Sequence, residues 1–284
     1  MVGNNVAQQK EQAAKRNVRV AAAQMISGPR VDDNLAVAGR LVADAVAQGA
    51  QLVALPEYFP IMGMNDGDKV LVREADGDGP IQAWLAETAA RHGIWLIGGS
   101  IPLMAKDPAK VLNSSVVYGP DGGRVSRYDK IHLFGFQKGS ECYNESATIE
   151  AGKIPAAFDT PFGRIGLSIC YDLRFPELYR ALGAEEAIDL LVIPAAFTET
   201  TGRAHWEILL RARAIENQCY VLAVGQGGRH ENGRETHGNS MLIDPWGNIL
   251  DRKLKGPGVV IGDLDHAFIA ETRASLPALK HRVM

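Results

Sequence analysis

Short apolar runs alternate with amphipathic segments along almost the whole chain. Runs rich in Val, Ile, Leu and Ala have the length of buried strands, at residues 18–24, 52–56, 94–98, 114–118, 164–170, 190–194, 220–224, 240–244 and 259–263. Segments with helical spacing follow many of them, at residues 32–48, 80–92, 176–182, 203–217 and 265–275. Asp32 stands where an N-cap belongs, and Pro80 where a first-turn proline belongs. The alternation predicts an α/β fold with buried sheets.

Two stretches interrupt this pattern. Residues 57–79 and 130–163 are rich in Gly, Pro and polar residues and show no clear period. Loops of this length in a compact domain tend to carry function. No linker divides the chain, so we expect one domain over residues 18–284. The polar residues 1–17 are predicted to form a flexible tail, and they lack the apolar stretch of a secretory signal.

Composition narrows the classes of partner. The chain has 284 residues, with 30 Lys and Arg against 33 Asp and Glu, which gives a net charge of −3. No dense Lys/Arg block is present, which argues against a nucleic-acid partner. No apolar run approaches the roughly 18 residues that span a bilayer, which argues against a membrane partner. Three cysteines, an odd number, disfavour a disulfide framework and indicate a reducing, cytoplasmic setting.

The most informative segment is RIGLSICYDLRFPELYR, residues 164–180. A strand pattern stops at Cys170, and Pro176 then opens a helix. Reactive groups collect at the carboxyl ends of strands in α/β sheets, and helix N–H groups there favour a thiolate. The backbone N–H of Tyr171 would be placed to stabilise an oxyanion. A cysteine taken alone is more often a buried structural thiol, so the case depends on its partners.

A first partner is Glu57, which follows the apolar run of LVALPE. A carboxylate at a strand end is commonly a solvated loop residue. Here Pro56 and Tyr58 flank Glu57, and desolvation by such neighbours raises the pKa of a carboxyl group. A general base that works near neutral pH needs that property.

A second partner is Lys130 in YDKIHLF, which has unusually apolar neighbours for a surface lysine. A buried ammonium group needs carboxylate partners, whereas an exposed lysine needs none. Glu145, in the loop that follows, is a candidate for a second carboxylate.

Competing chemistries lack their motifs. The sequence contains no HExxH, no CxxC, no zinc-like histidine spacing, no phosphate-binding GxxxxGK[ST] and no GxSxG. GQGG at residues 225–228 lacks the full dinucleotide fingerprint. His132 and His205 could pair with Cys170 as in papain-like enzymes, but positions that hydrogen-bond beside the site fit them better. We expect neither a metal nor an organic cofactor.

Together these motifs resemble the carbon–nitrogen hydrolase (nitrilase) superfamily, whose members use a Glu–Lys–Cys triad. Glu57 in LPEYF, Lys130 in DKIHLF and Cys170 in ICYDLRFPELYR occur in that order, with spacings of 73 and 40 residues. Glu145 resembles the additional loop glutamate of the superfamily. The resemblance covers roughly residues 18–284.

Within the superfamily the chain resembles the deaminated glutathione amidases of the Nit branch. The resemblance lies in AFTETTGRAHWEILLRARAIENQCYVLAVGQGGRH (residues 196–230), in HGNSMLIDPWG and in LPALKHR. The ω-amidases, which differ after the AHWE segment, are the alternative. Asn239 stands where a His is usual, and Gly135 where an Asp is common. We expect both departures to reshape the rim of the pocket.

The resemblance implies a four-layer αββα sandwich of two mixed β-sheets flanked by helices. It also implies a homodimer or larger assembly, paired through the helix that opens at Pro176 and through residues 203–217. The implied reaction hydrolyses a small carboxylate-bearing amide with water, giving an acid and ammonia through a cysteine thioester.

The resemblance also suggests how the substrate is held. Arg174 is the candidate for a bidentate grip on a substrate carboxylate, unless it pairs with Glu177. Further pocket residues are expected to be Tyr171, Phe197, Thr198, Tyr58 and Phe59. The alternative functions are an ω-amidase acting on α-ketoglutaramate or α-ketosuccinamate, a nitrilase or N-carbamoyl hydrolase, and a non-catalytic interaction protein.

Overall fold

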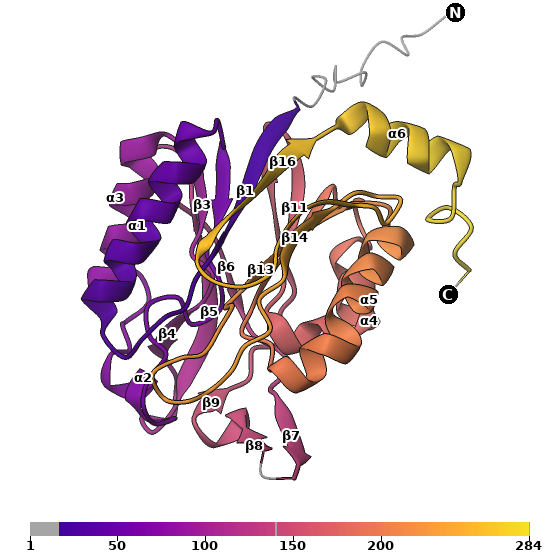
Figure 1. Cartoon of the computed structure of the whole chain (residues 1–284). Coiled ribbons are helices and arrows are strands. Elements are labelled where there is room, and N and C mark those ends of the chain that lie inside the picture. The colour runs from indigo at the N-terminus through magenta and orange to yellow at the C-terminus, as the bar shows by residue number, and fades with distance from the viewer. Residues whose placement is uncertain (1–16, 140, 284) are drawn as a thin grey trace, which may run out of the picture.

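Two β-sheets stack face to face, and helices cover the outer face of each (Figure 1). The computed structural model describes residues 17–139 and 141–283. Residues 1–16 of the expected tail lie outside the described part of the chain.

The first sheet has the order β16-β1-β2-β3-β5-β4, and β6 and β9 pair with β5. Its strands are β1 (Val18–Gln24), β2 (Leu52–Ala54), β3 (Trp95–Ile97), β4 (Ile101–Met104), β5 (Val111–Tyr118), β6 (Arg124–Asp129), β9 (Ile149–Glu150) and β16 (Gly258–Leu264). The second sheet has the order β10-β11-β12-β13-β14-β15. Its strands are β10 (Ala156–Thr160), β11 (Gly163–Leu167), β12 (Leu190–Ala195), β13 (Tyr220–Gly225), β14 (Ser240–Ile243) and β15 (Ile249–Lys253). Both sheets are mixed, because each contains parallel and antiparallel pairs.

The helices lie on both sides of the sandwich, with α1 and α3 outside the first sheet and α4 and α5 outside the second (Figure 1). Their bounds are α1 (Val31–Ala47), α2 (Asp68–Leu71), α3 (Pro80–His92), α4 (Pro176–Leu182), α5 (Glu199–Asn217) and α6 (His266–Ser275). The predicted four-layer αββα sandwich is therefore confirmed. None of these helices is long and apolar enough to cross a bilayer, as far as the described residues go.

Strand β1 shows why the apolar runs are nearly continuous. Successive side chains of a strand point to opposite faces of its sheet. Val20 and Ala22 join the core between the two sheets, whereas Ala21 and Ala23 join the core beneath α1 and α3. Both faces of the strand are buried, so the alternation of apolar and polar residues disappears.

Three local expectations need correction. The stretch 57–79, expected as loop, contains the short helix α2. Arg30, not Asp32, occupies the N-cap of α1, and Asp32 lies in the first turn. The stretch 130–163, expected as loop, contains β9, β10 and the hairpin of β7 (Gly135–Lys138) and β8 (Glu141–Asn144). None of these hairpin residues is buried, and half of them are Gln, Lys, Glu or Asn, so the hairpin carries no apolar run.

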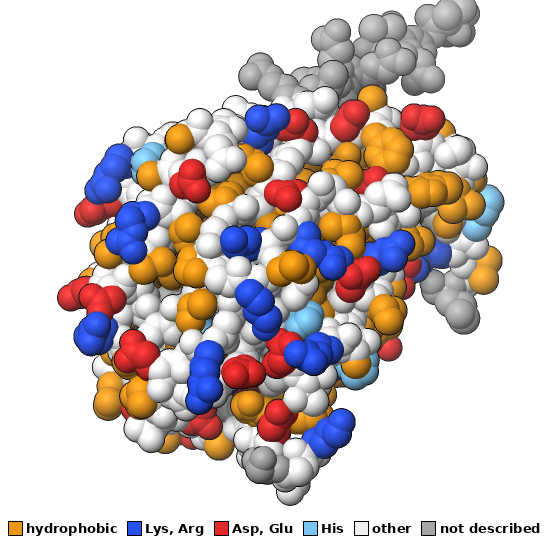
Figure 2. All heavy atoms as spheres, viewed as in Figure 1, with side chains coloured by type: hydrophobic (Ala, Val, Ile, Leu, Met, Phe, Trp, Pro, Cys, Tyr) orange, Lys and Arg blue, Asp and Glu red, His pale blue; other side chains and the backbone are white. Residues whose placement is uncertain are grey.

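The surface carries charges of both signs. On the face shown in Figure 2, Lys and Arg side chains are interspersed with Asp and Glu, and no single-sign patch dominates. This mixture matches the near-balance of charge in the sequence.

Candidate active site

The four residues singled out for chemistry lie at the carboxyl ends of strands and come together. Glu57 follows β2, and Lys130 comes directly after β6. Cys170 opens the short 3₁₀ helix η2 (Cys170–Arg174) after β11, and Glu145 opens η1 (Glu145–Ala147) after β8. The first sheet thus supplies Glu57 and Lys130, and the second sheet supplies Cys170.

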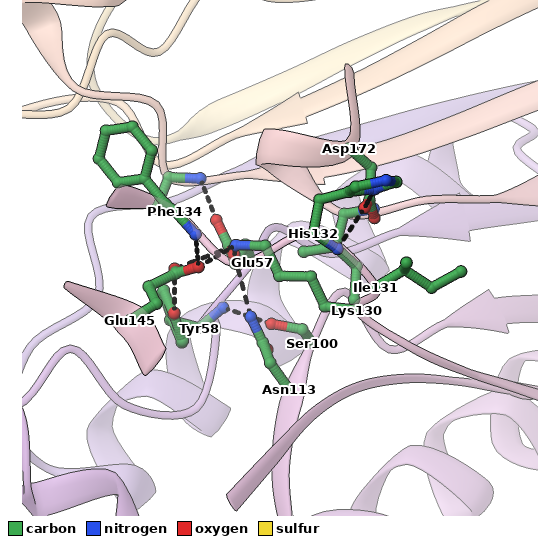
Figure 3. A network of polar contacts seen from close by, with 12 residues as sticks. Glu57, Tyr58, Ser100, Asn113, Lys130, Ile131, His132, Phe134, Glu145 and Asp172 are labelled. Carbon is green, nitrogen blue, oxygen red and sulfur yellow. Dashed lines mark hydrogen bonds and ion pairs between the residues drawn. The ribbon is translucent and has the colours of Figure 1, made fainter. Parts of the chain in front are cut away.

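Lys130 lies between the two carboxylates, as Figure 3 shows. Its Nζ is 2.8 Å from Glu57 Oε1 and 2.8 Å from Glu145 Oε2. The side chain is fully buried. Burial acts to lower its pKa, but the carboxylates of Glu145 and Glu57 raise the pKa above its ordinary value. Lys130 is therefore an ammonium ion.

Glu57 accepts hydrogen bonds at both carboxylate oxygens. Oε1 accepts from Asn113 Nδ2 at 3.0 Å as well as from Lys130, and Oε2 accepts from the backbone N–H of Ala196 at 2.8 Å. Gln226 donates to the backbone carbonyl of Glu57 at 3.1 Å. These bonds fix the carboxylate of a residue that is almost fully buried.

The carboxylate of Glu145, like that of Glu57, accepts hydrogen bonds at both oxygens. Oε2 accepts from the backbone N–H of Phe134 at 2.7 Å, and Oε1 accepts from the Tyr58 hydroxyl at 2.8 Å. Burial acts to raise its pKa, but Lys130 and these hydrogen bonds bring the pKa below its ordinary value. The buried cluster of Glu57, Lys130 and Glu145 has two acidic side chains for one ammonium group.

Cys170 lies beside this cluster with a backbone φ of 49°. Left-handed φ values cost a non-glycine residue about 1–3 kcal/mol and concentrate at functional sites. Burial raises the pKa of the thiol well above its ordinary value, and the nearby Glu57 raises it further through its charge and a side-chain hydrogen bond. The expectation of a partial thiolate is therefore wrong for the resting site, because burial and two carboxylates outweigh Lys130. The thiol is instead poised to give its proton to Glu57.

A narrow cavity of about 10 Å³ opens at Cys170. Four of the six expected pocket residues line it, namely Tyr171, Arg174, Phe197 and Thr198. Arg174 Nη1 lies 3.1 Å from His205 Nδ1, and its guanidinium faces the rings of Tyr171 and Phe197. These contacts, rather than an ion pair with Glu177, orient Arg174.

A larger chamber of about 330 Å³ adjoins the narrow cavity. The two share Phe134, Glu145 and Arg234 in their walls. Tyr58 lines the chamber, as do residues that the sequence did not single out, among them Lys69 and Asn232. Phe59, in contrast, is buried in the core beneath α1 and α3 and does not reach either space.

Asp172 supports the site, although no pattern in the sequence marked it. Its Oδ2 accepts from the Tyr128 hydroxyl at 2.7 Å and from the backbone N–H of Ile169 at 2.8 Å. Its Oδ1 accepts from the backbone N–H of His132 at 3.1 Å and lies 2.7 Å from His132 Nδ1 (Figure 3). This carboxylate joins the turn at Cys170 to the segment after Lys130. His132 therefore has the supporting hydrogen-bonded position that the sequence favoured.

The two departures from the family pattern lie outside the walls of both spaces. Asn239 has φ 52°, which asparagine tolerates well, and its carbonyl accepts from Trp206 Nε1 at 2.8 Å. Gly135 starts β7, next to the lining residue Phe134. The expectation that they form the pocket rim is not met.

Among the described residues, no group of three or more His, Cys, Asp or Glu side chains is arranged so that it could hold a metal ion.

Comparison with known proteins shows the family to which the chain is similar. The carbon–nitrogen hydrolase family model matches residues 19–274. A deaminated glutathione amidase of Synechocystis is 43% identical over 267 residues, covering 93% of this chain and 97% of the relative. An omega-amidase of Xenopus laevis is 38% identical, covering 93% and 94%. The crystal structure of the Caenorhabditis elegans NitFhit protein superposes with a TM-score of 0.86 at 36% identity, covering 94% of this chain and 65% of that one.

The chain belongs to the carbon–nitrogen hydrolase family. Its relatives include Nit-type proteins, as the resemblance in sequence indicated.

Proposed function

We propose that this protein is an amidase that hydrolyses a carboxylate-bearing amide, with deaminated glutathione as the first candidate substrate. The observation that carries the proposal is the buried Cys170 thiol beside Glu57 and Lys130, whose carboxylate and ammonium groups are joined at 2.8 Å. A nucleophile, a base and a cation for a developing oxyanion are the parts that acyl transfer needs.

Acylation follows from this arrangement. Glu57 accepts the thiol proton as Cys170 Sγ attacks the amide carbon. Lys130 and the backbone N–H of Tyr171 stabilise the oxyanion of the tetrahedral intermediate. The C–N bond then breaks, and Glu57 returns the proton to the leaving nitrogen. A thioester on Cys170 remains.

Deacylation reuses the same base. Glu57 takes a proton from a water molecule that attacks the thioester carbon, and the proton returns to the Cys170 sulfur as the acid is released. Glu145 holds Lys130 from the side opposite Glu57, which keeps the ammonium in place through both steps. No step requires a cofactor.

The substrate class rests on Arg174 and on the relatives. Arg174 lines the cavity at Cys170 and presents a guanidinium that suits a carboxylate. Relatives 37–43% identical are named deaminated glutathione amidases. The amide nitrogen of deaminated glutathione belongs to a peptide bond, so its leaving group is an amine. Ammonia, the product expected from the sequence, leaves only from primary amides.

An ω-amidase acting on α-ketoglutaramate or α-ketosuccinamate is the second candidate. The similarity to the Xenopus laevis omega-amidase supports this reading.

We further propose that residues 18–284 act as one catalytic domain, paired with a second copy through α5. The groups assigned to catalysis come from both sheets, which share one core. The outer face of α5 exposes Ile208 (70%) and Ile215 (47%), and such apolar surface marks a contact site.

The state of the cysteines supports a cytoplasmic location for the protein. None forms a disulfide, and the three are Cys142, Cys170 and Cys219.

A substrate panel tests the main proposal. The purified protein is assayed for 2-oxo acid, amine and ammonia release from deaminated glutathione, α-ketoglutaramate, neutral amides, nitriles and ureido acids. We expect the highest kcat/KM with deaminated glutathione. Preference for the primary amide supports the ω-amidase, and turnover of nitriles or ureido acids alone contradicts both candidates.

A further inference from the structure

Two cations in the chamber beyond Cys170 lack carboxylate partners. Lys69 Nζ donates to Thr148 Oγ1 at 3.1 Å and lies 5.7 Å from the centre of the Tyr58 ring. Arg234 donates through Nη2 to the carbonyl of Ala196 at 2.8 Å, and its Nε is buried with no hydrogen-bond partner among the described residues. Within that part of the chain, neither cation has a carboxylate oxygen within 4.0 Å.

The acidic groups nearby compensate this pair only in part. Glu145 lines the chamber, but Lys130, Tyr58 and the N–H of Phe134 already bind its oxygens. Asp66 lines the chamber and is exposed. Burial lowers the pKa of Lys69; Asp66 and Glu145 offset part of this effect through their charges, whereas Arg234 and Lys130 add to it by repulsion, and the pKa stays below its ordinary value. A partly buried cation is stabilised by a counter-charge, so an anion bound here would relieve both effects.

The chamber has the size and lining of a ligand site. Its volume of about 330 Å³ falls within the range of about 300–1,000 Å³ that is typical of ligand pockets. Three of the lining residues are asparagines, Asn65, Asn144 and Asn232, a residue type whose amide can pair with peptide groups. A primary amide would leave this space without an occupant.

We propose that this chamber is the leaving-group site, which holds the amine half of an N-substituted amide with its carboxylate between Lys69 and Arg234. The proposal rests on the proposed function, because Cys170 must attack the acyl half in the adjoining cavity. Arg234 lines both spaces and marks the boundary between the halves. During acylation the S–C bond forms, the C–N bond breaks, and the thiol proton passes through Glu57 to the nitrogen of the departing amine.

The test compares three amides with the same 2-oxoglutaryl acyl group. The first is the primary amide, the second carries cysteinylglycine, and the third carries cysteinylglycinamide, which lacks the terminal carboxylate. Each is assayed by release of the 2-oxo acid with the wild type, Lys69→Met and Lys69→Arg. Lys106→Met is the matched control, because Lys106 is exposed in the turn between β4 and β5.

We expect Lys69→Met to raise KM for the cysteinylglycine amide by about 10- to 100-fold, the worth of one charge-assisted hydrogen bond. Its selectivity for that substrate over the other two should fall by the same factor. Lys69→Arg should recover most of the loss, and Lys106→Met should keep the wild-type selectivity.

The outcomes separate the two proposals. A wild type that releases 2-oxo acid from none of the three amides contradicts the proposed function. A wild type that turns over the primary amide but not the cysteinylglycine amide contradicts both the leaving-group site and deaminated glutathione as the substrate, and it leaves the ω-amidase candidate in place. A Lys69→Met variant whose selectivity equals that of the wild type contradicts the leaving-group site alone.

Discussion

The side chain of His132 lies 2.7 Å from the carboxylate of Asp172, and the backbone N–H of His132 donates to the same oxygen. This pair joins two segments that are far apart in sequence. One segment carries Lys130 and the other begins at Cys170, so the position of each depends on a carboxylate that contacts neither the nucleophile nor the base. The ring of His132 also stacks on the ring of Phe175, with 3.7 Å between the two ring centroids, which adds a second contact between the segments.

We predict that Asp172→Asn lowers both stability and turnover. An asparagine side chain points an NH₂ group at donors that now face a carboxylate oxygen. The loss should be about 1–3 kcal/mol in the free energy of unfolding, measured by urea denaturation. The value of kcat should fall more than KM rises, because acylation geometry is disturbed. Asp78→Asn, at an exposed turn, is the control, and equal effects of the two variants would contradict this role.

Cys170→Ala should abolish hydrolysis while the fold persists. Loss of the nucleophile is expected to reduce kcat by at least about a thousandfold. Release of 2-oxo acid measures activity, and circular dichroism checks the fold. Cys219→Ala is the matched control, because Cys219 is buried in the core between the sheets. Turnover near the wild-type rate in Cys170→Ala would overturn the proposed mechanism.

Arg174→Ala should weaken binding of carboxylate-bearing amides. Its guanidinium lines the cavity at Cys170 and is oriented by His205. We expect KM to rise by about 10- to 100-fold for such substrates, with a smaller effect on neutral amides. Steady-state kinetics on matched substrate pairs decide the matter. Similar losses on both kinds of amide would argue that Arg174 supports the cavity wall rather than the substrate.

His230 makes stability depend on pH. Its Nδ1 lies 2.8 Å from the carbonyl of Ser27, which can only accept, so Nδ1 carries the proton. Burial lowers the pKa of His230 to about 4. As pH falls, the unfolded chain, whose histidine pKa is near 6.5, therefore takes up the second imidazole proton before the folded protein does. Stability is fully present above about pH 6.5 and is lost toward pH 4.

The shift corresponds to about 3 kcal/mol in the free energy of unfolding between pH 7 and pH 4. Urea denaturation across this range, for the wild type and for His230→Gln, isolates the contribution. The variant should lose less stability on acidification than the wild type. Parallel curves for the two proteins would show that His230 is not the source.

Much of the fold was predictable because local signals agreed with the tertiary structure. Helices α3 and α4 begin at Pro80 and Pro176, where a first-turn proline predicts a helix start. Strands of the two sheets are buried on both faces and read as apolar runs. The hairpin of β7 and β8 escaped prediction, because its residues are exposed or half-buried and form no apolar run.

The candidate site was predictable to the same degree. Glu57, Lys130 and Cys170 stand at strand ends in a fixed order, which the sequence displays. Asn113 lies within β5 and reaches Glu57 only because β2, β3 and β5 lie side by side in one sheet, so no local pattern marks it. Lys69 likewise sits on the four-residue helix α2 inside a stretch expected to be loop.

The division of the chemical groups between the two sheets has a further consequence. A cut at the exposed residues 153–155, between β9 and β10, would leave Glu57, Lys130 and Glu145 on one fragment and Cys170 on the other. Strand β16 of the second fragment pairs with β1 of the first, so the two fragments share a sheet and can associate through it. Neither piece alone carries a full set of reacting groups. Recovery of hydrolysis on mixing would therefore serve as a direct readout of fragment complementation.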